Sequence, residues 1–178
     1  MKKLIGLLLI LAAMQVNAAP VAATPALCNG KPITIYGTNS DDFILGTNGN
    51  DVIASLDGVD QIYGNRGDDT ICGGDGNDHI HAGPGNDHVF GGLGDDHMEG
   101  CTGNDVLMGG FGTDFAEGDC IYKDDPGVDY LNGGPGPDSL TGSWGYLKGL
   151  EADRCVTDPT DEIGLCKIVN GIVTVGHP

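Results

Sequence analysis

Aspartate recurs at a fixed spacing through the middle of the chain. Counted in blocks of nine residues from Gly37, the sixth position is Asp in eleven successive blocks. One of these blocks, residues 118–132, carries about six extra residues at 118–123 without breaking the series. The series comprises Asp42, Asp51, Asp60, Asp69, Asp78, Asp87, Asp96, Asp105, Asp114, Asp129 and Asp138. Carboxylate oxygens are ligands that hard divalent cations prefer, so these residues are candidate metal ligands.

Glycine and aliphatic residues share the same nine-residue period. Position four is Gly in every block except the first, which has Ser40, and glycine supplies the positive φ that a tight loop needs. Position five is mostly Asn or Asp, which predicts left-handed backbone there. Side chains alternate along a strand, so position eight is expected to point inward. The position-eight residues are Ile44, Ile53, Ile62, Ile71, Ile80, Val89, Met98, Leu107, Ala116, Leu131 and Leu140.

These blocks resemble the RTX, or haemolysin-type, calcium-binding nonapeptide GGxGxDxUx over residues 37–141. The resemblance implies an all-β fold, a right-handed parallel β-roll with two nonapeptides per turn. The first six residues of each block would form a loop and the last three a short strand. It also implies Ca²⁺ between stacked loops, with the eleven aspartates as ligands.

Stacking of the loops brings carboxylates close together along each edge of the expected roll. Turns about 4.8 Å apart would place like charges side by side, and a dication relieves their repulsion. Six loops on one edge and five on the other leave several calcium sites, at most about nine.

The overall composition fits a chain that needs a metal to fold. Of 178 residues, 32 are Gly, 9 are Pro and 26 are acidic, and the formal charge is −18. This charge excludes a nucleic-acid partner, because phosphates would be repelled. So few large apolar groups predict a chain that is largely disordered without calcium and folds on binding it.

The N-terminus has the pattern of a secretory signal peptide at residues 1–18. Lys2 and Lys3 precede the apolar run Leu4 to Met14, and small residues follow. The run is too short to span a membrane. Its removal leaves 6 basic against 26 acidic residues, a charge of −20. We therefore expect a secreted, extracellular protein, with a periplasmic location as the alternative.

Caps and disulfides are expected on both sides of a roll at 37–150. Residues 19–36 form a linker and cap, in which 28–36 read as a degenerate half-turn carrying Ile35. Residues 151–178 form a C-terminal cap with a hairpin around Asn170-Gly171. Six cysteines in a small exported chain favour disulfides, although several connectivities are open. The favoured pairs are Cys101–Cys120, Cys155–Cys166 and, by exclusion, Cys28–Cys72.

No catalytic motif is apparent, since HExxH and GxSxG are both missing, so the chain is not expected to be an enzyme. A patch of His79, His81, His97 and Glu99 could hold zinc, nickel or copper, and a polar outer surface is the simpler interpretation.

The predicted function is that of a secreted calcium-binding structural, surface or matrix module, whose protein or surface partner the sequence does not identify. The alternative is an adhesion or ligand-binding protein that uses an outer face of the roll. Ice binding is a weaker form of this alternative, because the Thr38-Asn39 ladder breaks off after two blocks.

Overall fold

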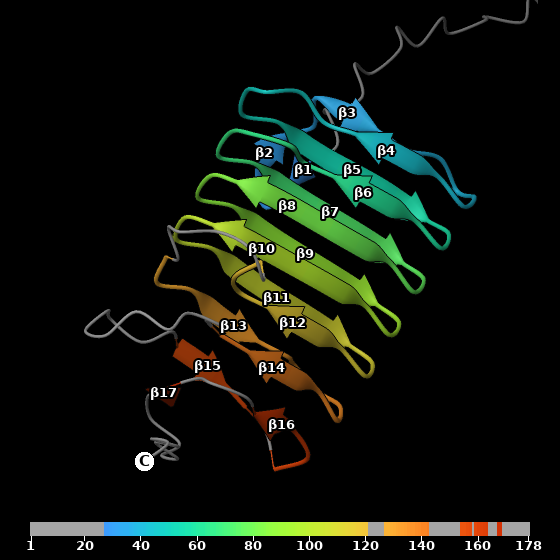
Figure 1. Ribbon diagram of the computed structural model, residues 1–178. Helices are drawn as coiled ribbons and strands as arrows, with labels where there is room; N and C mark the ends of the chain where they lie inside the picture. Colours follow the sequence, from blue (N-terminus) through green and yellow to red (C-terminus); the bar gives the residue numbers. More distant parts are fainter. Residues whose placement is uncertain (1–26, 121–126, 143–153, 158, 164–166, 169–178) are drawn as a thin grey trace, which may run out of the picture.

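The computed structural model describes residues 27–120, 127–142, 154–157, 159–163 and 167–168 (Figure 1). The described chain is made of short strands without a helix. The predicted signal peptide at 1–18, the hairpin around Asn170-Gly171 and Cys166 lie outside these residues.

Successive strands alternate between two parallel sheets (Figure 1). One sheet contains β4 (Phe43–Leu45), β6 (Gln61–Tyr63), β8 (His79–Pro84), β10 (His97–Thr102), β12 (Phe115–Glu117), β14 (Ser139–Thr141) and β16 (Glu162–Ile163). The other contains β3 (Ile35–Tyr36), β5 (Val52–Asp57), β7 (Thr70–Asp75), β9 (His88–Leu93), β11 (Val106–Phe111), β13 (Tyr130–Asn132), β15 (Arg154–Val156) and β17 (Lys167–Ile168). Residues 18 apart pair across the central strands, as Ile62 does with Ile80. The all-β parallel β-roll is therefore confirmed.

A single row of apolar side chains from each sheet forms the core. All eleven position-eight residues are buried, and ten of them are completely inaccessible to solvent. Ile35 is partly buried against this core and pairs with Ile53, as expected for a half-turn that covers the start of the core. Such a thin core leaves much of the stabilisation of a glycine-rich backbone to other interactions.

The loops stack closely enough to exclude side chains at the glycine positions. Gly74 and Gly76, at positions two and four of their block, have φ of +117° and +132°. A Cβ on Gly76 would overlap the carbonyl oxygen of Gly58 one turn earlier. These positions therefore need glycine both for their conformation and for the contact between turns.

The prediction of left-handed backbone at position five is wrong. The positive-φ residues of the repeats lie at positions two and four instead. At position five, the side chain accepts a hydrogen bond from the next turn: the Asn86 N–H donates to Asp68 Oδ1 (2.9 Å), and the Asn104 N–H donates to Asn86 Oδ1 (3.0 Å). Asn and Asp are thus used here as acceptors that join successive loops.

A short antiparallel hairpin closes the N-terminal side. Strands β1 (Leu27–Cys28) and β2 (Lys31–Pro32) are joined by Asn29-Gly30, whose φ values are +47° and +76°. Positive φ at both residues is the property that favours Asn-Gly in two-residue hairpin turns. The disulfide Cys28–Cys72, with Cα atoms 6.0 Å apart, fastens this hairpin to β7, and that predicted pair is confirmed.

The C-terminal strands continue the roll rather than only covering it. β15, β16 and β17 pair in parallel with β13, β14 and β15, so the two sheets extend past residue 150. Cys155 is buried in the core at this end and is disulfide-bonded, and its expected partner, Cys166, lies outside the described residues. No helix in the described part is long and apolar enough to cross a membrane.

Candidate calcium sites

The predicted aspartates form two rows, one along each edge of the roll. Each Asp ends its loop immediately before a strand, so the alternation of strands between the sheets divides the series in two. One row contains Asp42, Asp60, Asp78, Asp96, Asp114 and Asp138, and the other contains Asp51, Asp69, Asp87, Asp105 and Asp129. The structure thus brings together all eleven candidate residues in the six-and-five arrangement expected.

One oxygen of each inner carboxylate joins successive turns. The N–H of Asp60 donates to Oδ1 of Asp78 (2.9 Å), and the N–H of Asp87 donates to Oδ1 of Asp105 (2.9 Å). The same bond, at 2.8–2.9 Å, recurs along both rows from Asp42 to Asp138 and from Asp51 to Asp129. These bonds fix the orientation of the carboxylates and leave their second oxygens directed elsewhere.

The second oxygens face main-chain carbonyls in tight cradles. A Cβ on Gly73, at position one, would lie 2.5 Å from Asp78 Oδ2 and 2.6 Å from the Gly91 carbonyl oxygen of the next turn. Gly64 forms the same cradle with Asp69 Oδ2 (2.6 Å) and the Ala82 carbonyl oxygen (2.5 Å). Oδ2 is buried and accepts no hydrogen bond from the described residues in Asp60, Asp69, Asp78, Asp87, Asp96, Asp105 and Asp114.

Burial makes the ionised form of these carboxylates costly in the metal-free roll. Desolvation raises the pKa, the hydrogen bond from the preceding turn lowers it, and the neighbouring aspartates of the row raise it again. The pKa is raised to about 6 for Asp69, Asp78 and Asp114, to about 7 for Asp87 and Asp96, and to about 8 for Asp105. A cation among these oxygens would reverse that effect by stabilising the charged form.

The oxygen-only cradles suit a hard cation that accepts six to eight oxygen ligands, as Ca²⁺ does. The family model of the RTX calcium-binding nonapeptide repeat (4 copies) matches residues 36–71, 64–98, 72–107, 82–116 and 125–145. The chain belongs to this family. The repeats of this RTX protein accordingly bind Ca²⁺. No curated protein matches the chain significantly.

The longer aspartate row of the RTX roll has one member more than the repeats predicted. Asp161 lies immediately before β16, and its Oδ1 accepts a hydrogen bond from the Asp138 N–H (3.2 Å). Asp161 thus occupies the sixth position of a block that has lost its glycines. The signal that could have found it is the order Asp161, Glu162, Ile163, which keeps Asp two residues before an aliphatic residue.

Two blocks of the RTX roll depart from glycine at position one. Ser55 is buried, and its hydroxyl donates to the Gly73 carbonyl oxygen of the next turn (2.5 Å). Ala82 is buried and joins the apolar core. The surroundings of the adjacent carboxylates in these two loops therefore differ from those in the loops with glycine at position one.

The histidine patch lies on the strands β8 and β10 of the RTX roll, where its side chains are partly exposed. The two oxygens of Glu99 face two histidines: Oε2 is hydrogen-bonded to Nδ1 of His81 (2.9 Å), and Oε1 lies 3.3 Å from Nε2 of His97. The ring of His79 stacks on that of His97, with the ring centroids 4.6 Å apart. All four residues of the predicted patch are therefore neighbours on β8 and β10.

Proposed function

We propose that this chain is a secreted, non-enzymatic calcium-binding module whose β-roll forms when Ca²⁺ binds between stacked loops. The observation that carries the proposal is the row of buried Oδ2 atoms facing carbonyl oxygens without a hydrogen-bond donor among the described residues. A buried carboxylate oxygen left in this way costs free energy, and a bound cation offsets that cost.

The ligands proposed are the eleven aspartates together with the loop carbonyls that face them. Ca²⁺, when bound, supplies positive charge next to the carboxylates of both rows. The aspartates that follow the first member of each row would hold it through Oδ2 while Oδ1 keeps its bond to the preceding turn. Asp161 adds a further gap to the longer row beyond those counted from the repeats.

Secretion would move the chain from low to high calcium, so that it folds only after export. The family is typically exported, and the N-terminal pattern and the disulfides agree with an oxidising compartment. Extracellular calcium modules bind at about 10⁻⁴–10⁻³ M, so the chain would stay unfolded inside the cell and fold outside.

The test is far-ultraviolet circular dichroism of the full chain in chelator and then in millimolar CaCl₂, with MgCl₂ at the same concentration as the control. We expect a β spectrum in calcium alone, because Mg²⁺ is smaller and retains its water. An unchanged β spectrum in chelator would contradict calcium-coupled folding.

A second candidate function, adhesion through an outer face, is favoured by the exposed apolar end of the β4 sheet. Phe43 and Leu45 are 63% and 57% exposed, and Phe43 contacts the ring of Tyr63. Adsorption of the calcium-loaded chain to hydrophobic and to polysaccharide beads tests this candidate. Loss of adsorption in a Phe43→Ser, Leu45→Ser variant would support it, and equal adsorption by both chains would exclude this face.

A further inference from the structure

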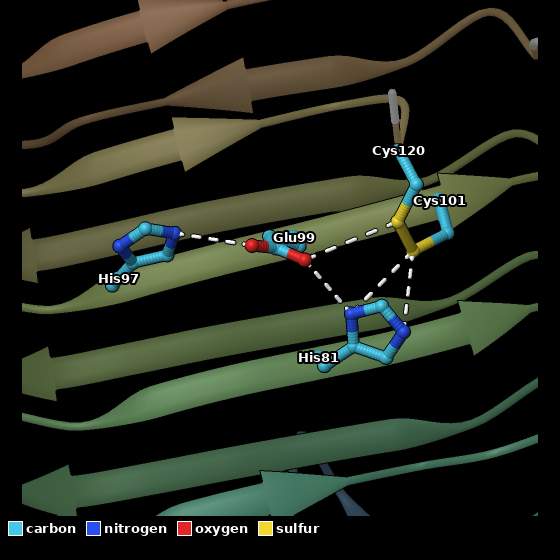
Figure 2. The surroundings of a disulfide bond; sticks show 5 residues. All are labelled: His81, His97, Glu99, Cys101 and Cys120. Carbon is cyan, nitrogen blue, oxygen red and sulfur yellow. Dashed lines mark hydrogen bonds and ion pairs between the residues drawn. A yellow bond between two sulfur atoms is a disulfide. The ribbon is translucent and has the colours of Figure 1, made fainter. Parts of the chain in front are cut away.

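A second set of metal-ligand side chains gathers around the Cys101–Cys120 disulfide (Figure 2). One ligand atom each from His81, Glu99, Cys101 and Cys120 lies within 4.8 Å of the others. Cys101 Sγ is 3.6 Å from His81 Nδ1, and Cys120 Sγ is 3.9 Å from Glu99 Oε2. Glu99 Oε2 is in turn 2.9 Å from His81 Nδ1.

The strand register of the roll creates this cluster. Glu99 pairs directly with His81 across β10 and β8, and Cys101 follows two residues later on the same strand. Cys120 reaches the group from the segment after β12, with its Cα 4.4 Å from that of Cys101. Cys101 is buried, whereas His81, Glu99 and Cys120 are partly exposed, so a metal ion has access from the outer face.

The donor set differs in kind from the aspartate rows. Two sulfurs, one imidazole and one carboxylate suit a borderline-soft ion in tetrahedral geometry, which is the preference of Zn²⁺ rather than Ca²⁺. Zinc binds thiolates and not disulfides, so these four groups can act together only when the two cysteines are reduced.

We propose that Cys101, Cys120, His81 and Glu99 form a zinc site in the reduced chain, so that this corner is closed either by a disulfide or by a metal. A trialkylphosphine with one water molecule supplies the two electrons, becomes the phosphine oxide, and converts the S–S bond into two thiols. Zn²⁺ then displaces the two thiol protons and binds both thiolates together with the imidazole and the carboxylate.

His97 acts as a positioning residue for this site. Its Nε2 lies 3.3 Å from Glu99 Oε1, the oxygen not directed at His81. A partner of this kind orients a metal-binding carboxylate, and its loss typically weakens metal binding by about 10–100-fold. His97→Ala should therefore weaken zinc binding by that factor without removing a ligand.

The experiment compares the oxidised and the phosphine-reduced full chain in saturating calcium, with zinc titrated against a chromophoric chelator. We expect a tight zinc site in the reduced chain alone, and cobalt in its place should give thiolate-to-metal charge-transfer absorption. Zinc should also protect Cys101 and Cys120, but not Cys28 and Cys72, from alkylation by iodoacetamide.

Matched variants locate the site. His81→Ala and Glu99→Gln should lose tight binding, while His88→Ala, on the other sheet, and the double variant Cys28→Ser, Cys72→Ser should keep it. Equal zinc binding by the oxidised and reduced chains would overturn the proposal. A reduced chain that loses its β spectrum in calcium would overturn it as well, because the site requires β8 and β10 to be paired.

Discussion

Asp105 is the residue at which calcium and protons should compete most clearly. It lies inside the five-membered row, is 1% exposed, and has a pKa raised to about 8, chiefly by desolvation. Its Oδ1 accepts the Asp87 N–H, and its Oδ2 shares with the Gly118 carbonyl oxygen the place that a Cβ on Gly100 would take. Asp105→Asn keeps the first acceptor and removes the charge.

The substitution should have opposite effects on the two states of the roll. At pH 7 the metal-free roll must take up a proton at Asp105, about three pH units above the ordinary pKa of this carboxyl group, and Asn avoids this cost of roughly 4 kcal/mol. In the calcium-loaded roll an ionic ligand is lost, worth about 1.5–3 kcal/mol if it resembles a charged hydrogen bond. The affinity for the calcium ion bound at Asp105 should then fall by about 10- to 150-fold, and the calcium midpoint of folding should rise.

The assay is a calcium titration that starts from the chain in chelator and is followed by circular dichroism, so that the metal-free and the loaded states are both recorded. Asp68→Asn is the matched control, because Asp68 lies on the same edge at position five, is exposed, and keeps its acceptor role toward Asn86. Equal shifts of the calcium midpoint in both variants would refute the reasoning, since overall charge and not the row would then decide affinity.

Three further outcomes follow from burial, loop packing and cross-linking. Because the aspartate pKa values are raised in the roll, protonation stabilises the metal-free roll fully below about pH 4, and this stabilisation is lost as the pH rises through 6 to 8. Circular dichroism in chelator should therefore show β structure increasing on acidification. The affinity for calcium should fall over the same pH range. In urea unfolding measured in calcium, Gly76→Ala should lower the free energy of unfolding by more than about 1 kcal/mol, whereas Gly49→Ala, whose Cβ would meet only Thr47 Oγ1 at 3.8 Å, should raise it by about 0.4–1 kcal/mol. Replacing Cys28 and Cys72 by Ser should cost about 4 kcal/mol in the same assay for a cross-link spanning 44 residues, and an unchanged midpoint would mean that the N-terminal hairpin adds no constraint.

The repeats made most of the roll predictable because every turn uses the same residues for the same contacts. An aspartate before each strand and an aliphatic residue within it were enough to assign both rows and the core. The disulfide Cys101–Cys120 followed from a spacing close to one turn, and the structure confirms it.

Features that depend on contacts between turns, and not on period, were missed or misread. Asp161 was overlooked because its block has lost the glycines, although its side chain still accepts the Asp138 N–H. The position-five side chains were assigned to backbone conformation, whereas Asn86 and Asp68 show that they bridge loops. The cluster around Glu99 requires the register of β8 and β10 and a cysteine, Cys120, from the extra residues at 118–123.

The position of the N-terminal hairpin could not be predicted from the repeat pattern. Asn29-Gly30 carries the same turn chemistry that was assigned to Asn170-Gly171 at the other end. Its position is set by Cys28–Cys72 and by the Lys31 Nζ donation to Thr70 Oγ1 (2.8 Å), which join residues far apart in sequence.

The most direct test of the central claim, that calcium bound between stacked aspartates holds the roll together, is a crystal structure of the full chain grown in calcium, with anomalous data. We expect two rows of calcium peaks along the edges, each within about 2.3–2.6 Å of an aspartate oxygen and of loop carbonyl oxygens. A folded roll with no calcium between its loops would contradict it.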